Sequence, residues 1–561
     1  MDKYYFTRDR KNSCQFMKKI LISVSGMLML IALAFNAFAG SGRPQKAKYR
    51  FIHNNDGSDL LGNIWFDRRP LTLADLDSCV DLVTNDTPIT TYMICSGSEF
   101  SYVPSKYGRI FGDDLNGTLS CGTDTLFHRY YDNAMYLQRQ GTDLIKATLS
   151  RAKANGKETF ITYRVNDLHF NDTTMHCPIY YTKWWLEHPQ FWVNDPSQGW
   201  HSAGALDFTF KEVRDHKLAI ISEQLDNYAD YIDGYELDFL RFFVYCKTGQ
   251  GAALAPQMTQ WMRKIRQKVN EVSAREHKKI LLTVRVAPTV EANLDHGLDV
   301  KQWLKEGLID FITIGTHMRI DPEIPVGKFR KDLGRALKVP LYASVDGVSY
   351  KNYEPVSQGM YRGTCSYILS HGADGMYLFN YYLSEYNKHG GEDLAEPGGE
   401  ICRYRSPKLM AELGSLKTME GRNKIYSLSE GRVEYGMHPN TPLPLDLAPG
   451  QNEQVSLYVA DDVKSIAPEE VILFLRTSRL PEADIRLNGS VPIVEVPGYA
   501  RIYDRERGLT GSEKVLCLVF PSSAVKQGEN IIRFKSADNN FTIIRVELAL
   551  KFGDVDYKGL F

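Results

Sequence analysis

Short apolar runs alternate with longer amphipathic segments along most of the chain. Eight runs have the length and composition of buried strands, namely Arg50–Asn54, Thr91–Ser96, Thr159–Asn166, Gly234–Arg241, Ile280–Ala287, Phe311–Thr316, Leu341–Val345 and Gly375–Asn380. Segments with apolar residues at helical spacing separate most of these runs or follow the last one, namely Leu73–Val83, Thr142–Ala154, Glu212–Tyr231, Ala255–Ala274, Val300–Glu306, Phe329–Leu337, Ser357–Ser370 and Ser406–Leu416.

This order of units predicts a closed parallel barrel. Strands that alternate with helices and read as near-continuous apolar runs are typical of a buried parallel sheet. Eight such units in this length predict a (β/α)8 TIM barrel over residues 45–418. An open doubly wound sheet is the alternative, but no glycine-rich phosphate-binding motif follows the first strand. Long insertions, Ser98–Arg139 and Leu168–Phe210, follow strands two and three, where we expect them to shape a substrate site.

Beyond about Met419 the apolar period changes from helical to alternating. Glycine, proline and asparagine turns separate short runs at Val455–Val459, Val471–Arg476, Ile485–Leu487, Val515–Phe520, Ile531–Lys535 and Thr542–Lys551. This pattern predicts an all-β, jelly-roll-like sandwich over residues 424–555. The stretch Pro521–Phe534 resembles the late strands of galactose-binding-like domains.

The N-terminal segment 1–39 predicts export. A lysine pair after Met17 precedes an apolar run and a small-residue site at Ala37-Phe38-Ala39, which together are typical of a signal peptide cleaved after Ala39. An uncleaved membrane anchor is the alternative. The expected location is periplasmic or secreted, with no membrane association after cleavage. The net charge of −1 favours neither nucleic acid nor an anionic membrane surface.

The fourth predicted strand carries the most informative chemistry. From Asp233 the chain reads Asp-Gly-Tyr-Glu-Leu-Asp-Phe-Leu-Arg-Phe. Glu236 and Asp238 are two residues apart, so both point to the same face of the strand. Buried carboxylates are costly unless they are paired or functional. We expect Asp238 to lie nearest the mouth of the barrel and Glu236 to lie one layer deeper, held between Arg164 and Arg285. Glu236 is itself a catalytic candidate, and the alternative for it is a structural role in support of Asp238.

Two motifs resemble those of a known group of proteins. Asp238 and Arg241 match the Asp and Arg of the fourth strand in glycoside-hydrolase-like, family-10-like barrel proteins, and the stretch from Arg164 to His169 is similar to their third strand. The resemblance implies a TIM barrel that acts on carbohydrate.

Glycoside hydrolysis needs two carboxylates that flank the scissile bond. Asp238 is the first candidate, and Asp346 after the seventh strand is the best partner by position. Retaining barrel glycosidases also draw their pair from strands four and seven, usually as glutamates, so the aspartate leaves the stereochemical outcome open. Asp167, at the end of strand three, is the rival partner.

Other polar and aromatic side chains are predicted to contact the sugar. They are Asp167, Arg164, Arg285, His53, His169, His317, Trp184, Asn380 and Tyr381. The histidines end strands but form no His-x-His or His-Glu-x-x-His pattern, so we expect no metal site. The alternative for each histidine is a buried polar residue, and for Trp184 it is packing within its own loop.

The sequence therefore predicts an exported glycoside hydrolase that needs no cofactor and has a carbohydrate as its partner. Two alternatives stay open. One is a glycan-binding barrel without catalysis, and the other is a carbohydrate lyase or deacetylase. The pattern specifies neither the sugar nor an oligomeric state.

Overall fold

The computed structural model describes residues 48–63, 69–98, 100–110, 125–167, 182–316, 320, 322–346, 356–381, 406–429, 441–507, 512–537 and 539–553. The barrel and the β-domain described below belong to one compact unit, Tyr49–Phe561. The predicted signal segment, Met17–Ala39, lies outside the described residues. Among the helices that are described, none is both long enough and apolar enough to cross a membrane.

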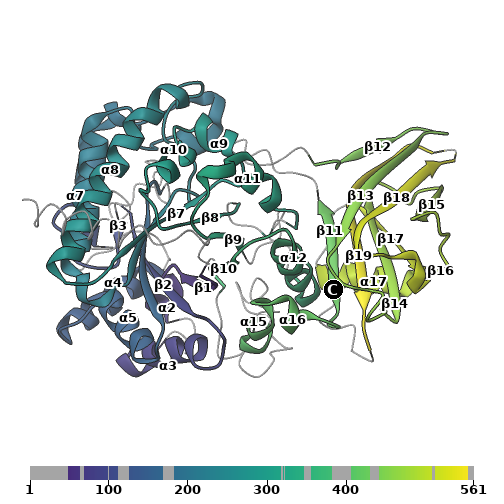
Figure 1. Ribbon diagram of the computed structural model, residues 1–561, viewed down its shortest axis with the longest axis horizontal. Coiled ribbons are helices and arrows are strands. Elements are labelled where there is room, and N and C mark those ends of the chain that lie inside the picture. The colour runs from purple at the N-terminus through teal and green to yellow at the C-terminus, as the bar shows by residue number, and fades with distance from the viewer. Residues whose placement is uncertain are drawn as a thin grey trace, which may run out of the picture. The chain divides into compact units, whose positions relative to one another are not determined.

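Eight described strands form a closed parallel barrel (Figure 1). They are β1 (Arg50–Asn55), β2 (Thr91–Gly97), β5 (Glu158–Arg164), β6 (Gly234–Asp238), β7 (Leu281–Val286), β8 (Phe311–Ile314), β9 (Leu341–Asp346) and β10 (Gly375–Phe379). Each strand pairs in parallel with the next, and β1 pairs with both β2 and β10, which closes the ring. Two short strands, β3 (Phe100–Ser101) and β4 (Arg109–Ile110), extend the sheet from β2. The predicted (β/α)8 barrel is confirmed.

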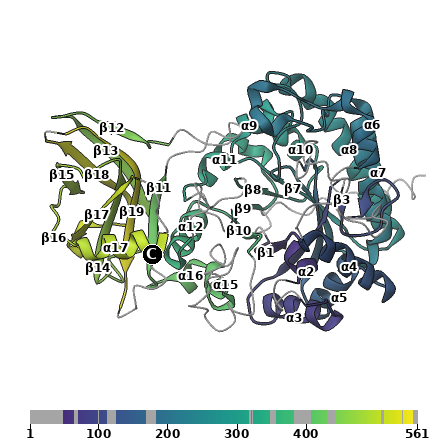
Figure 2. The ribbon, with the colours of Figure 1, turned by 180° about the vertical axis from the view of Figure 1, so that it is seen from behind.

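Helices follow the barrel strands and lie outside them (Figure 2). The longer ones are α3 (Leu73–Thr84), α4 (Thr125–Arg139), α5 (Leu144–Ala154), α7 (Lys211–Asn227), α8 (Gly251–Arg275), α11 (Val326–Leu333) and α12 (Gln358–Ser370). Shorter ones are α2 (Ser58–Gly62), α6 (Lys183–Glu187), α9 (Val290–Asp295), α10 (Val300–Lys305), α15 (Pro407–Leu413) and α16 (Leu416–Met419). Side-chain caps fix several starts, as where Thr72 and Asp75 form a reciprocal capping box at α3.

The interior of the barrel changes from apolar to charged along its axis. An apolar cluster that includes Ile52, Phe160 and Phe311 fills its lower part. Strand register places Thr162, Glu236 and Thr283 side by side above this cluster. Two residues further along the same strands, the register aligns Arg164, Asp238 and Arg285. Side chains alternate along a strand, so Glu236 lies one layer below Asp238, as the sequence predicts.

The C-terminal residues form two antiparallel sheets around a core of their own. The larger sheet contains β11 (Lys424–Ser429), β12 (Leu445–Leu447), β14 (Glu470–Thr477), β16 (Val494–Glu495), β17 (Lys514–Phe520) and β19 (Phe541–Lys551). The smaller sheet contains β13 (Asn452–Val459), β15 (Ala483–Leu487) and β18 (Gly528–Ser536). The predicted sandwich is confirmed, and a helix that the sequence analysis missed, α17 (Pro497–Arg507), stacks Tyr503 on Phe474 of β14.

Helix α12 of the barrel packs closely on β11, the first strand of the sandwich. The Arg362 side chain donates to Glu412 at 2.7 Å and to the Asn423 carbonyl at 3.2 Å. At Gly363 the helix comes so near the strand that an added Cβ would lie 2.0 Å from the Ile425 carbonyl oxygen. The helix can therefore approach this strand only with glycine at position 363.

We predict that Gly363→Ala lowers the melting temperature, because the new methyl group would force the helix and the strand apart. Overpacking of this kind costs about 1–3 kcal/mol, more than alanine gains in a helix. The matched control is Gly327→Ala in α11, where the nearest atom to an added Cβ is 3.9 Å away. Thermal melts should show a loss for the first variant and none for the second, and equal melts would contradict the close approach.

Candidate active site

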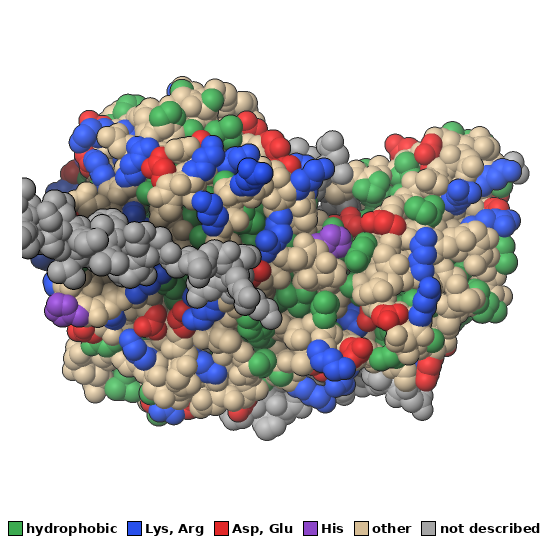
Figure 3. All heavy atoms as spheres, viewed as in Figure 1, with side chains coloured by type: hydrophobic (Ala, Val, Ile, Leu, Met, Phe, Trp, Pro, Cys, Tyr) green, Lys and Arg blue, Asp and Glu red, His purple; other side chains and the backbone are tan. Residues whose placement is uncertain are grey.

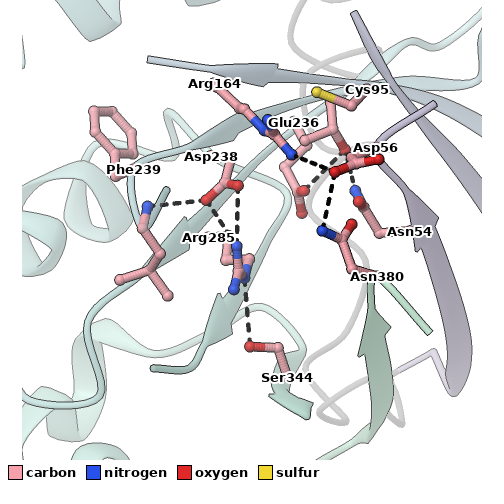
Figure 4. A network of polar contacts seen from close by, with 12 residues as sticks. Asn54, Asp56, Cys95, Arg164, Glu236, Asp238, Phe239, Arg285, Ser344 and Asn380 are labelled. Atoms are coloured by element: carbon pink, nitrogen blue, oxygen red, sulfur yellow. Dashed lines mark hydrogen bonds and ion pairs between the residues drawn. The ribbon is translucent and has the colours of Figure 1, made fainter. Parts of the chain in front are cut away.

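Asp238 ends β6 and is held by an arginine of the neighbouring strand (Figure 4). Its two carboxylate oxygens accept hydrogen bonds from Nη1 of Arg285 at 3.1 and 3.0 Å, and the Leu240 amide donates to Oδ1 at 2.9 Å. Both side chains of the ion pair are almost completely buried. Arg285 is itself fixed, because its guanidinium lies 3.7 Å from the Phe379 ring centre and its Nε donates to Ser344 at 3.4 Å.

Glu236 has hydroxyl partners and not the two arginines expected from the sequence. Its Oε1 accepts from the Tyr377 hydroxyl at 2.6 Å and from Thr162 at 3.0 Å. The predicted Arg164–Glu236–Arg285 set is therefore wrong as a hydrogen-bonded group. Both arginines stand in the layer of Asp238, one step above Glu236, and they bond to other carboxylates.

Burial decides the proton affinity of Glu236. The pKa of this carboxyl is raised from 4.5 to about 7, because loss of solvent and the charge of Asp238 raise it more than Tyr377, Arg285 and Thr162 lower it. A carboxyl with a pKa near neutrality can hold a proton under ordinary conditions, as groups at functional sites often do. We therefore assign Glu236, one layer below Asp238, as a carboxyl group that can hold a proton.

A second charged network joins β1, β5 and β10 at the same end of the barrel. Arg164 donates to Oδ2 of Asp56 and Oδ2 of Asp167, each at 3.2 Å. Asn380 also donates to Asp56, at 3.2 Å, and its backbone has a φ of 48°, which is uncommon for a residue other than glycine. Arg164, Asp167 and Asn380 were predicted from the sequence and are brought together here.

Asp56 was missed by the sequence analysis. It follows β1 and receives both donors of the network, while its other oxygen accepts from the Ser58 amide and hydroxyl at 3.0 and 2.6 Å. The sequence feature that could have revealed Asp56 is the run Asn54-Asn55-Asp56 at the end of an apolar strand. Polar residues in that position face the mouth of a parallel barrel.

Asp346 is the last residue of β9 and is buried. Ser344, two positions earlier, points inward, because it accepts a hydrogen bond from Arg285. Alternation along the strand places Asp346 on this same inner face, one layer further toward the C-terminal end. The predicted partner of Asp238 therefore lies at the end of the barrel where the sequence analysis expected it.

Two residues predicted to bind sugar face away from the interior. His53 alternates with the inward-facing Ile52 and Asn54, stacks on Tyr92 with ring centres 5.8 Å apart, and lies 3.1 Å from the Tyr381 carbonyl through Nε2. The Tyr381 ring packs edge-on against Tyr361 of α12, with centres 5.3 Å apart. Both side chains are buried between strands and helices, so the predicted contact with sugar is wrong for each.

The structure places Trp184 in an aromatic cluster outside the strand ends. Its ring lies parallel to His216 of α7 at 3.9 Å, and it also stacks on His188 and Phe191 at 4.8 and 5.8 Å. This is the packing alternative considered from the sequence. His169 and His317 lie outside the described residues. Within the described ranges, no group of three or more His, Cys, Asp or Glu side chains could hold a metal ion.

No protein-family model matches the chain, and no curated protein matches it. Among solved structures, a GH138 enzyme targeting pectin rhamnogalacturonan II is 11% identical over 66% of this chain and 37% of its own, with a TM-score of 0.37. A cycloisomaltooligosaccharide glucanotransferase from Paenibacillus sp. is 10% identical over 90% and 58%, with a TM-score of 0.29. The α-L-fucosidase isoenzyme 1 from Paenibacillus thiaminolyticus is 14% identical over 88% and 97%, with a TM-score of 0.33.

This chain spans less than two thirds of the first two of these proteins. At such TM-scores the likeness says nothing of activity, and the assignment of the barrel rests on the strand pairing.

We predict that Glu236 makes the fold less stable as the pH rises. A carboxyl with a raised pKa contributes its full stability below pH 4.5 and loses it as the pH rises through 7. The loss amounts to about 3 kcal/mol for a shift of this size. Glu236→Gln stays neutral and can keep both hydrogen bonds to its oxygen. Unfolding measurements should therefore find it close to wild type at pH 5 and more stable at pH 8.5. A difference that is the same at both pH values would contradict the raised pKa.

Proposed function

We propose that this protein is a glycoside hydrolase that uses Asp238 and Asp346 at the C-terminal mouth of its barrel. The observation that carries the proposal is that two strand-end carboxylates, on β6 and β9, lie on the inner face of a closed parallel barrel. This end of the barrel is where active sites of the fold are built. Glycoside hydrolysis requires two carboxyl groups on opposite sides of the scissile bond.

The contacts support different roles for the two groups. Asp238 is paired with Arg285 and accepts a hydrogen bond from a backbone amide. We therefore assign it the role of the base that activates water or of the nucleophile that attacks the anomeric carbon. Asp346 then supplies the proton to the leaving oxygen. Asp167, which accepts a hydrogen bond from Arg164 at 3.2 Å, is the rival for that role.

The network around Arg164 suits the binding of sugar hydroxyls. Asp56, Asp167 and Asn380 present carboxylate and amide groups that can exchange hydrogen bonds with vicinal hydroxyls. On the face seen in Figure 3, acidic and basic side chains of the described residues are interspersed. The predicted signal segment supports action on a poly- or oligosaccharide outside the cytoplasm.

A glycan-binding protein without catalysis is the second candidate. One observation favours it, namely that Asp238 and Asp56 are each tied to a buried arginine. Such pairing can hold a binding surface rigid without providing a reactive group. The two candidates differ in whether the bound glycan is cleaved.

We predict that Asp238→Asn lowers kcat/KM by at least about a hundredfold, the usual contribution of an acid–base group. A screen of polysaccharides with the mature wild-type protein first identifies the cleaved glycan. The matched control is Asp233→Asn, directly before the first residue of the same strand, where Oδ2 accepts from the Thr159 amide at 3.0 Å. The control should keep its activity, since Asp233 lies at the bottom of the barrel.

Two results would count against the proposal. Full turnover by Asp238→Asn would remove this residue from the mechanism. Glycan binding by the wild type without release of any product would favour the non-catalytic candidate.

A further inference from the structure

Arg285 bonds to one carboxyl group of β6 and acts electrostatically on a second. Its Nη1 bonds to both oxygens of Asp238, and its guanidinium lies 6.0 Å from the ring centre of Tyr377. The Tyr377 hydroxyl in turn donates to Glu236 at 2.6 Å. The charge of Arg285 also acts on Glu236 and lowers its pKa. One buried cation therefore serves Asp238 directly and lies within electrostatic reach of Glu236.

Glu236 is only half satisfied by its neighbours. Oε1 accepts two hydroxyl hydrogen bonds, whereas Oε2 is buried and has no hydrogen-bond partner among the described residues. A neutral carboxyl tolerates this environment better than a carboxylate, because an ionised group in low dielectric needs a counter-charge. If Glu236 ionises, Arg285 is the cation that acts on it.

We propose that Glu236 is a positioning residue. While Glu236 is protonated it does not compete for Arg285, which pairs with Asp238 alone, and loss of the proton from Glu236 disrupts the Asp238–Arg285 pair. The proposal rests on the function proposed above and adds a control of the same site. Glu236 acts through Arg285 and needs no contact with substrate.

The groups that face Glu236 come from several strands. Among the described residues, the charged or titratable ones are Asp238 on the same strand, Arg285 on β7 and Tyr377 on β10. Thr162 on β5 contributes only a hydroxyl, which also accepts from Asn54 of β1 at 2.6 Å. Arg164 is engaged one layer higher by Asp56 and Asp167. Glu236 and Asp238 are therefore the two carboxyl groups of β6 that compete for Arg285.

The first test is the pH profile of kcat/KM on the cleaved glycan. Wild type should lose activity as Glu236 ionises, with a fall of roughly thirtyfold between pH 6 and pH 8.5 for one group that titrates near 7. In Glu236→Gln this alkaline fall should disappear. In Tyr377→Phe it should move to higher pH, because the lost hydroxyl favours the ionised form of Glu236.

A matched control separates this effect from a general one. Glu158→Gln changes another interior carboxyl, at the N-terminal end of β5, which accepts from Arg50 at 2.6 and 3.0 Å. Its profile should keep the alkaline fall of the wild type. An alkaline fall that survives in Glu236→Gln, or that is lost in Glu158→Gln as well, would overturn the proposal.

The second test needs no substrate, so it distinguishes failure of this proposal from failure of the proposed activity. Melting temperatures are measured for wild type, Glu236→Gln, Asp238→Asn and the double variant at pH 5.5 and 8.5. At pH 5.5 the two changes should be additive, since Glu236 is neutral. At pH 8.5 the double variant should melt well below the additive value, because the ionised Glu236 still serves Arg285 in the Asp238→Asn variant and the double variant removes it as well. Additivity at both pH values would overturn the proposal even if the protein cleaves glycans.

Discussion

The buried pair between Arg285 and Asp238 is the interaction on which the mouth of the barrel depends. Removing one member of such a pair leaves an uncompensated charge, at a cost of roughly 3–5 kcal/mol. The pair exists because strand register sets Asp238 directly beside Arg285. A shift of one residue in either strand would turn one of the side chains toward the helices. The closed ring of parallel strands therefore fixes the chemistry at its end.

The layers below explain why so much charge is tolerated there. The lower interior is filled by large apolar and aromatic side chains, and the next layer offers hydroxyl and amide groups from Asn54, Thr162 and Tyr377. Those groups hydrogen-bond to one another and to Glu236 without bringing a charge of their own. Arginines meet aspartates in the layer above. Polarity thus rises toward the end where a substrate would enter.

The sequence predicted the elements of the fold better than the contacts of the site. All eight barrel strands were located. The spacing of Glu236 and Asp238 also fixed their shared face, because side chains two residues apart on a strand point the same way. For His53 the choice was open. Phe51 and His53 alternate with Ile52 and Asn54, and each pair combines one apolar with one polar residue. Only the assembled barrel shows that His53 turns outward.

The pairing of Arg164 shows the second limit of sequence reasoning. Alternation gives the face of a strand but not how far a long side chain reaches along the barrel axis. Arg164 extends toward Asp56, a residue just beyond a different strand, and not toward Glu236. The two arginines consequently serve separate groups. Arg164 links residues at the ends of β1 and β5, and Asn380 after β10 joins the same network. Arg285 links β6, β7 and β9. Between them they tie most of the ring by side-chain contacts at the carboxyl ends of the strands. Such contacts hold carboxyl groups at a fixed separation, which is what acid–base catalysis on a sugar requires.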